Sequence, residues 1–168
     1  MDQDFPEISI NELNEFVVAI GKCVQNYGVI ECLINELIKV IIQDSLIQHH
    51  IIIQPISKRI EILKGLVERD SASIKEQGII LTDLFCDAKS SFKNRNKVAH
   101  NPFAIEENKI GKTSPTVWGI NVIRNSDITE EWVDSSKLNG FISESHKLIE
   151  RFRQLQEYYN QRIKEERK

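Results

Sequence analysis

The chain has 168 residues, of which 40% are hydrophobic and 28% are charged, a balance typical of one soluble globular domain. Its net charge of −3 argues against a general nucleic-acid binder, and its three cysteines form no Cys-x-x-Cys pair that would indicate disulfides or a zinc site. The acidic start and the short, interrupted apolar runs predict neither a secretory signal nor a membrane-spanning helix. We therefore expect a reduced cytoplasmic protein without a metal or cofactor.

A first long helix is predicted over residues about 10–45. Ser9 and Glu12 form the capping-box pattern that opens a helix. Apolar residues then recur every three or four positions and share one stripe. Gly21 and Gly28 are tolerated at a cost of about 1 kcal/mol each, and a break at Gly28 remains an alternative.

Residues 49–54 are ambiguous. The run Ile51-Ile52-Ile53 is β-branched and fits either a short strand or a buried turn. Pro55 follows and suits the first turn of a helix, where its missing N–H costs nothing. Apolar residues at helical spacing continue from there, so a second helix is predicted over about 55–70.

A third helix is predicted over about 73–100. Ser73 and Glu76 repeat the capping-box pattern at its start. Its end is set by Asn101 and Pro102, because a residue that precedes proline avoids helical backbone angles.

The pattern then changes to extended runs before a last helix. Two such runs within residues 103–124 flank a turn-like Gly-Lys-Thr-Ser-Pro segment, which predicts a small β-hairpin. Apolar spacing of three and four returns over about 134–165 and predicts the last helix. We expect an all-α fold, a four-helix bundle with an appended β-hairpin, in a single domain over residues 1–168.

A local basic segment stands out within this acidic chain. Residues 88–100 contain no acid and four cations, namely Lys89, Lys93, Arg95 and Lys97. A basic patch of this kind suits a phosphate ligand, although a solvated helix face is the more ordinary use of a charge run.

Arg95 and His100 together supply the groups that RNA cleavage needs. A guanidinium forks onto phosphate oxygens, and an imidazole moves protons near neutral pH. Because the 2′-hydroxyl of RNA is the nucleophile, a base, an acid and a cation suffice without a metal. One imidazole does not easily act as both base and acid, whereas two chains about a two-fold axis present two.

The spacing of these two residues poses a geometric problem. Five residues on an ideal helix correspond to about 140° of rotation, so Arg95 and His100 would not share one face. Two solutions remain open. The helix ends before His100, or the two side chains converge across a groove between protomers.

The segment Arg95-Asn96-Lys97-Val98-Ala99-His100 resembles the motif of HEPN domains, in which Arg precedes His by four to six residues and is commonly followed by a polar residue. Upstream, residues 27–34 are similar to the first-helix pattern of that family and residues 57–63 to its second helix. The resemblance covers about residues 10–103. It implies a helical bundle that forms a homodimer with facing motifs, and a metal-independent endoribonuclease (a hydrolase) of toxin–antitoxin or antiviral defence systems.

The resemblance also implies residue roles. Arg95 would stabilise phosphate and transition-state charge, His100 would transfer protons, and Asn96 would orient the histidine or contact ribose. The lysines of the basic segment would hold the RNA backbone, namely Lys89, Lys93 and Lys97. Purely structural alternatives are a salt bridge from Arg95 to Glu31 and a helix C-terminal cap at His100.

Two further functions stay open, because many HEPN domains lack catalysis. One is an interaction module that binds a protein partner such as an antitoxin, and the other is an RNA-binding scaffold that does not cleave. His49 and His50 point apart on a helix or strand and have no ligand cluster nearby, so we interpret them as surface residues and not as a metal site. The hairpin lies outside the common family core and would shape specificity.

Overall fold

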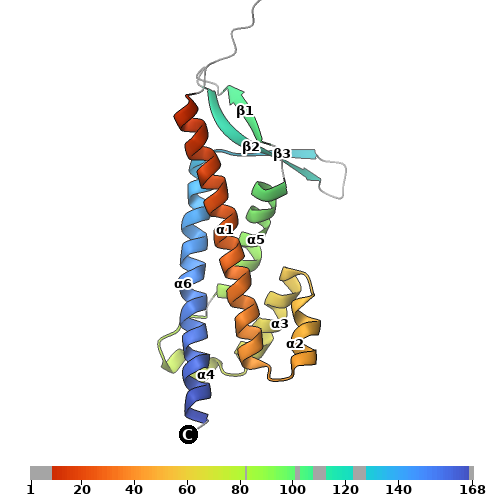
Figure 1. The fold of residues 1–168 in the computed structure, drawn as a ribbon, viewed down its shortest axis with the longest axis vertical. Coiled ribbons are helices and arrows are strands. Elements are labelled where there is room, and N and C mark those ends of the chain that lie inside the picture. Colours follow the sequence, from red (N-terminus) through yellow and green to blue (C-terminus); the bar gives the residue numbers. More distant parts are fainter. Residues whose placement is uncertain (1–8, 82, 101–102, 108–112, 123–127, 167–168) are drawn as a thin grey trace, which may run out of the picture. The chain divides into compact units, whose positions relative to one another are not determined.

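The computed structural model describes residues 9–81, 83–100, 103–107, 113–122 and 128–166, and side-chain exposure for residues 9–81, 83–100 and 133–166. The described chain is mainly helical and carries one small antiparallel sheet (Figure 1). The elements in chain order are α1 (Ile10–Ile41), α2 (Ser45–Ile52), α3 (Ile56–Glu68), α4 (Ser71–Glu76), α5 (Leu84–His100), β1 (Phe103–Glu107), β2 (Thr113–Val122), β3 (Ile128–Val133) and α6 (Ser135–Glu166).

Two compact units make up the molecule. The first unit comprises residues 1–25 and 93–143, and the second unit comprises residues 26–92 and 144–168. The division falls inside α1, α5 and α6, so each of these helices contributes to both units. The expectation of a single domain over residues 1–168 stays a prediction.

The predicted first, second and last helices are present. α1 ends at Ile41 and continues through Gly28, so the alternative of a break at that glycine is wrong. α3 lies within the predicted second helix, and α6 matches the predicted last helix. Long apolar stripes at helical spacing explain this agreement, because burying such a stripe is the main source of helical stability.

The expectation of a strand or buried turn at residues 49–54 is wrong. The segment from Ser45 to Ile52 is helix α2, and none of its residues is buried. Asp44 is the N-cap, and its side chain accepts hydrogen bonds from the backbone N–H groups of Leu46 (2.9 Å) and Ile47 (3.1 Å). This local cap overrides the β-propensity of the isoleucine run.

The single third helix predicted over 73–100 is also wrong, because α4 and α5 are separate helices. α4 closes with a pair of backbone hydrogen bonds, from Gly78 N–H to the Lys75 carbonyl (3.0 Å) and from Ile79 N–H to the Ile74 carbonyl (3.3 Å). This Schellman-type closure requires the left-handed backbone of Gly78, whose φ is +74°. α5 then runs to His100, and the predicted stop at Asn101-Pro102 lies outside the described residues.

The segment after α5 forms strands in the order β1-β2-β3, each pair antiparallel. Phe103 pairs with Val117 across β1 and β2, and Trp118 pairs with Trp132 across β2 and β3. β1 and β2 lie within the predicted range 103–124, while β3 was not predicted. Gly111 and Lys112 of the predicted turn lie outside the described residues. The described chain therefore has three strands and six helices, where we expected one hairpin and four helices.

Five helices, α1, α3, α4, α5 and α6, contribute buried side chains to the core of the second unit. In Figure 1 the C-terminal part of α1 runs beside α6, and Asn26 of α1 donates a hydrogen bond to Ser145 of α6 at 2.9 Å. The ring centroids of Phe85 and Phe152 lie 6.2 Å apart and join α5 to α6. The fully buried large side chains of this unit are Tyr27, Ile30, Ile34, Leu37, Ile38, Ile60, Leu63, Ile74, Leu84 and Phe152.

α1 is long and apolar enough to cross a membrane, the one such helix among the described residues. Length and composition alone do not test our expectation that no helix of the chain spans a membrane. Core helices of soluble proteins and N-terminal signal sequences have the same length and composition, and α1 supplies several of the buried side chains above. The cytoplasmic location therefore stays a prediction.

Candidate functional site

The basic motif occupies the last turns of α5, in the first unit. Val98 is buried and anchors this end of the helix. Arg95 is half-buried, whereas Asn96 and His100 are exposed. The helix thus holds one apolar side chain inward and leaves the polar groups of the motif accessible.

Arg95 contacts both of the other predicted catalytic side chains. Its Nη1 atom lies 3.1 Å from His100 Nε2, and the same nitrogen donates a hydrogen bond to Asn96 Oδ1 at 3.1 Å. The first solution to the spacing problem, a helix that ends before His100, is wrong, because α5 continues through His100. Convergence across a groove between protomers stays a prediction. The arginine side chain is long enough to reach around the helix to the histidine.

The contact with Arg95 constrains how the His100 ring can bond. A guanidinium has only donors, so a hydrogen bond between Arg95 Nη1 and His100 Nε2 needs the ring nitrogen as its acceptor. The tautomer of the ring that carries its hydrogen on Nδ1 has this acceptor. The same Nε2 lone pair is the group through which an imidazole acts as a general base.

Arg95 has no carboxylate partner among the described side chains. Its side-chain contacts there are the Asn96 amide and the His100 ring. Glu31, the acid considered as a structural partner for Arg95, instead pairs with Arg59. The salt bridge from Arg95 to Glu31 is therefore wrong.

The three lysines differ in their surroundings. Lys93 is exposed in the first unit and has no ion-pair partner among the described side chains. Lys97 is half-buried in the same unit. Lys89 belongs to the second unit and forms an ion pair with Glu61, and this contact lowers the pKa of the Glu61 carboxyl. Lys89 is thus less available than Lys93 for an RNA phosphate.

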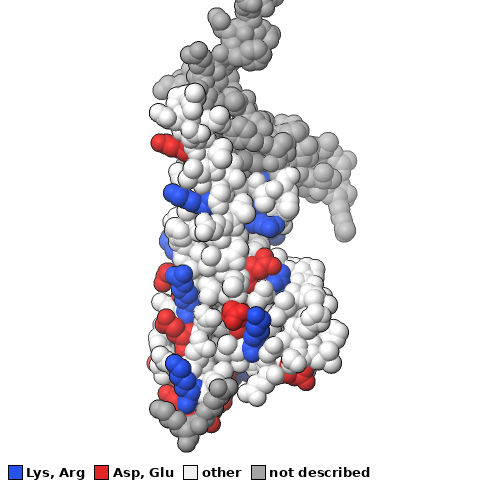
Figure 2. Space-filling view, viewed as in Figure 1, with Lys and Arg blue, Asp and Glu red and all other residues white. Residues whose placement is uncertain are grey.

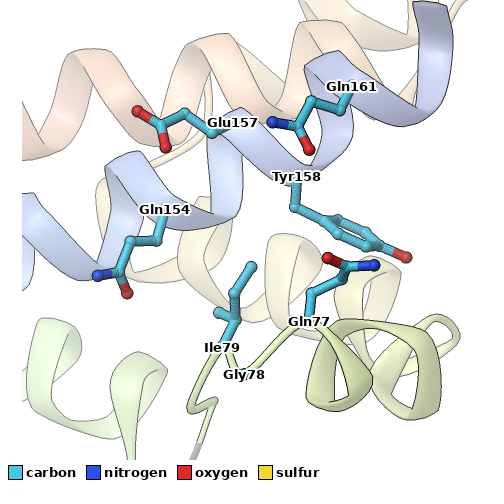
Figure 3. Close-up of a pocket in the computed structure, with 7 residues that line it drawn as sticks. All are labelled: Gln77, Gly78, Ile79, Gln154, Glu157, Tyr158 and Gln161. Carbon is cyan, nitrogen blue, oxygen red and sulfur yellow. The ribbon is translucent and has the colours of Figure 1, made fainter.

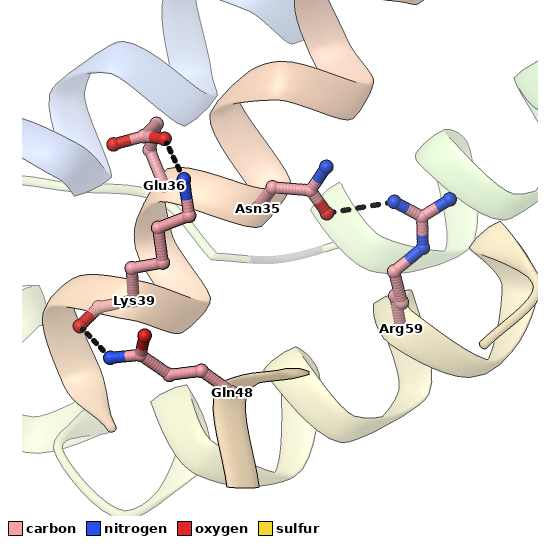
Figure 4. A network of polar contacts seen from close by, with 5 residues as sticks. All are labelled: Asn35, Glu36, Lys39, Gln48 and Arg59. Carbon is pink, nitrogen blue, oxygen red and sulfur yellow. Dashed lines mark hydrogen bonds and ion pairs between the residues drawn. The ribbon is translucent and has the colours of Figure 1, made fainter. Parts of the chain in front are cut away.

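The second unit contains a polar network that sequence analysis missed (Figure 4). The Arg59 guanidinium is buried and donates to Asn35 Oδ1 at 2.7 Å and to a carboxylate oxygen of Glu31. Nearby, Gln48 donates to the backbone carbonyl of Lys39 at 3.1 Å and so caps the end of α1. The network joins α1 to α2 and α3, so we interpret it as stabilising the packing of these helices.

Charges on the second unit are otherwise mixed. On the face drawn in Figure 2, acidic and basic side chains lie next to one another over this unit. The ion pairs of the second unit include Arg151–Asp87 (2.8 Å) and Arg162–Asp70 (2.8 Å). Neighbouring opposite charges cancel at a distance, so this surface offers no strong field for a polyanion.

Among the described residues no group of three or more His, Cys, Asp or Glu side chains could hold a metal ion. The rings of His49 and His50 lie 6.2 Å apart on exposed α2. All three cysteines are free thiols, and burial raises the pKa of the Cys23 thiol to about 11. Cys23 is therefore an inert core residue.

No family model matches the chain, and neither a curated protein nor a solved structure matches it. The functional argument accordingly rests on the motif and on the geometry described above.

Proposed function

We propose that this chain is a cytoplasmic, HEPN-type, metal-independent endoribonuclease that acts as a homodimer, as a toxin or as an effector of phage defence. The observation that carries the proposal is the contact of 3.1 Å between Arg95 Nη1 and His100 Nε2 at the exposed end of α5. It supports the proposal because a guanidinium without a carboxylate partner among the described side chains lies beside an imidazole, so both groups could act on one phosphodiester. These are the two groups that cleavage by the RNA 2′-hydroxyl needs.

The reaction follows from the chemistry of these groups. When RNA binds, the Arg95 guanidinium exchanges its contact with His100 for hydrogen bonds to the phosphate oxygens. This exchange leaves the lone pair of His100 Nε2 free. Nε2 then takes the 2′-hydroxyl proton, and the 2′-oxygen attacks phosphorus. The 5′-oxygen leaves with a proton from the protonated imidazole of a second subunit. The products are a 2′,3′-cyclic phosphate and a free 5′-hydroxyl, and Asn96 keeps Arg95 in place through its hydrogen bond.

The test is cleavage of a labelled single-stranded RNA by the full chain in the presence of a chelator. We expect Arg95→Ala and His100→Ala each to lower the cleavage rate by roughly 100-fold or more, the usual contribution of one acid–base or charge-stabilising group. Matched controls are Arg153→Ala and His146→Ala, which remove the same side chains from exposed positions on α6 and should leave the rate unchanged. Cleavage that needs added magnesium, or that survives both motif substitutions, would contradict the proposal.

A second candidate is an interaction module without catalysis, which binds an antitoxin-like protein or only RNA. It is favoured by large apolar side chains that lie exposed on α1 and α2, among them Val17, Val18, Leu46 and Ile47. Surfaces of this kind are typical of protein contacts. A monomer without cleavage that forms a stable complex with a protein encoded beside it would support this candidate over the nuclease.

A further inference from the structure

A groove in the second unit lies between α6 and the segment that follows α4 (Figure 3). Its volume is about 290 Å³. One wall is a face of α6, on which lining residues recur every three or four positions: Gln154, Glu157, Tyr158 and Gln161. The opposite wall is Gln77, Gly78 and Ile79, and Figure 3 shows the Gln77 carboxamide beside the Tyr158 ring.

Backbone hydrogen bonds hold the second wall in place. The Schellman-type closure of α4 fixes Gly78 in a left-handed conformation and ties Ile79 N–H to the Ile74 carbonyl, whose residue is fully buried. The groove is therefore bounded by two ordered walls, a helix face and a capped turn.

The neighbouring Tyr159 ring holds the Tyr158 ring in position. Tyr158 is half-buried, and the Tyr159 ring packs against it edge-on, with centroids 5.1 Å apart and planes 83° apart. Tyr159 is buried and donates a hydrogen bond from its hydroxyl to Asp70 at 3.0 Å. Burial and the neighbouring Asp70 raise the pKa of Tyr159, so it stays a neutral donor. Tyr158 thus presents a fixed aromatic surface to the groove.

The lining has an unusual chemical balance. It contains three carboxamides, each of which both donates and accepts hydrogen bonds, one carboxylate, and no cation. Arg162, adjacent in sequence, is occupied by ion pairs to Asp70 (2.8 Å) and Glu166 (3.0 Å). A phosphate would meet the Glu157 carboxylate, while Arg162, which also interacts with Tyr158, already has two carboxylate partners. A flat, uncharged ring with N–H donors would instead find a stacking partner and several amides.

We propose that this groove binds one unpaired nucleobase that carries an exocyclic amino group. The base stacks on Tyr158, the carboxamides pair with its edge, and Glu157 accepts from the amino group. The volume is at the lower end of ligand pockets, which suits a single base. The inference deepens the proposed function, because it makes single-stranded RNA the substrate. It rests on that proposed function for the source of the base. A free nucleoside carries the same chemistry.

The first arm of the test uses 2′-O-methyl RNA, which lacks the nucleophile and cannot be cleaved. Binding of fluorescently labelled A-rich, C-rich and U-rich single strands and of a duplex is measured by anisotropy with the full chain. We expect Tyr158→Leu to weaken binding of the A-rich and C-rich strands by roughly 5- to 150-fold, the range for loss of one aromatic stacking platform. Tyr158→Phe keeps the ring and should stay within about twofold of the native chain.

The second arm titrates adenosine, cytidine and uridine and follows backbone amide chemical shifts at residues 77–79 and 154–161. We expect adenosine and cytidine to shift these signals and uridine to shift them much less. Circular dichroism of each variant confirms folding, and Tyr158→Phe keeps the test valid if Tyr158→Leu does not fold.

The outcomes separate this inference from the nuclease proposal. If the chain binds adenosine, loses this binding in Tyr158→Leu and cleaves no RNA, the result supports the base-binding inference and contradicts the nuclease proposal. Cleavage that depends on Arg95 and His100, with RNA affinity unchanged in Tyr158→Leu, overturns the groove alone. Four results would each overturn the inference. They are uridine binding as tight as adenosine binding, duplex binding as tight as single-strand binding, a loss of affinity in Tyr158→Phe as large as in Tyr158→Leu, and no binding of any nucleoside.

Discussion

Arg59 in the second unit and Arg95 in the first unit are chemically identical residues in opposite circumstances. Each donates a hydrogen bond to an asparagine amide oxygen, Arg59 to Asn35 at 2.7 Å and Arg95 to Asn96 at 3.1 Å. Arg59 has in addition the carboxylate of Glu31, and only 9% of its side chain is exposed. The additional contact of Arg95 is the ring of His100, at the C-terminal end of α5.

The difference shows how surroundings decide what an arginine does. A guanidinium taken out of water needs an opposite charge to offset its lost hydration, and once paired it has little attraction left for a ligand. A half-buried guanidinium without a carboxylate partner among the described side chains keeps part of its hydration and has its charge to offer a ligand. Arg59 is therefore suited to hold helices together, and Arg95 is suited to receive a phosphate.

Substitution of each arginine by alanine should separate these two tasks. We expect Arg59→Ala to lower the free energy of unfolding by about 3 kcal/mol, because it leaves Glu31 without its partner. The estimate takes the lower end of the range for buried pairs, since 38% of the Glu31 side chain is exposed. Arg95→Ala should change stability by less than about 0.5 kcal/mol, as surface substitutions usually do. Urea unfolding of both variants measures the two values.

The control for this pair is the double variant Arg59→Met, Glu31→Leu. It should recover most of the stability that Arg59→Ala removes, because no charge is left unpaired and the apolar volume is kept. A destabilisation by Arg95→Ala as large as that by Arg59→Ala would show that Arg95 is a structural residue and would end the comparison.

The two asparagines extend the comparison at smaller scale. Asn35→Ala removes a short hydrogen bond to a buried charge and should cost about 1.5 kcal/mol of stability. Asn96→Ala should leave stability within about 0.5 kcal/mol but lower RNA cleavage by roughly tenfold, the rate equivalent of one hydrogen bond to a charged group. Unfolding curves and cleavage rates on the same samples give both quantities. An Asn96→Ala variant with full activity would remove Asn96 from the site.

The parts of the fold that could be predicted are those with a long apolar stripe. α1 and α6 bury such stripes, so their spacing in the sequence reflects the structure directly. α2 was missed because it buries nothing and depends on the Asp44 cap. The division between α4 and α5 was missed because it depends on left-handed backbone at Gly78 and Asp83. A positive φ is expected first at glycine, so the identity of Asp83 does not indicate one.

The candidate site could be predicted in its residues but not in its geometry. The motif pointed to Arg95, Asn96 and His100, whereas their contact depends on how far one flexible side chain reaches. The Glu61 partner of Lys89 is 28 residues away in sequence, and no local pattern marks such a pairing. The groove at Tyr158 was not foreseen because its second wall lies in a segment expected to be helical.

The smallest expected effect concerns the lysines of the basic segment. Binding of 2′-O-methyl single-stranded RNA should weaken as salt rises, and removing one lysine that binds a phosphate should flatten the plot of log affinity against log salt by about 0.7. We expect this change for Lys93→Ala and no change for Lys89→Ala, because Lys89 is already paired with Glu61. Anisotropy titrations between low and moderate salt measure both slopes.

If Lys93→Ala and Lys89→Ala flatten the salt plot equally, the expected difference between the two lysines is wrong. Equal flattening would mean that RNA displaces Glu61 from Lys89, at the expense of an exposed ion pair that contributes little in water. Glu61→Gln would then raise RNA affinity in the native background and leave the Lys93 contribution unchanged. If instead Lys89→Ala leaves the slope unchanged and Glu61→Gln has no effect on affinity, Lys89 does not contact the RNA, and the phosphate contacts of α5 are confined to its last turns in the first unit.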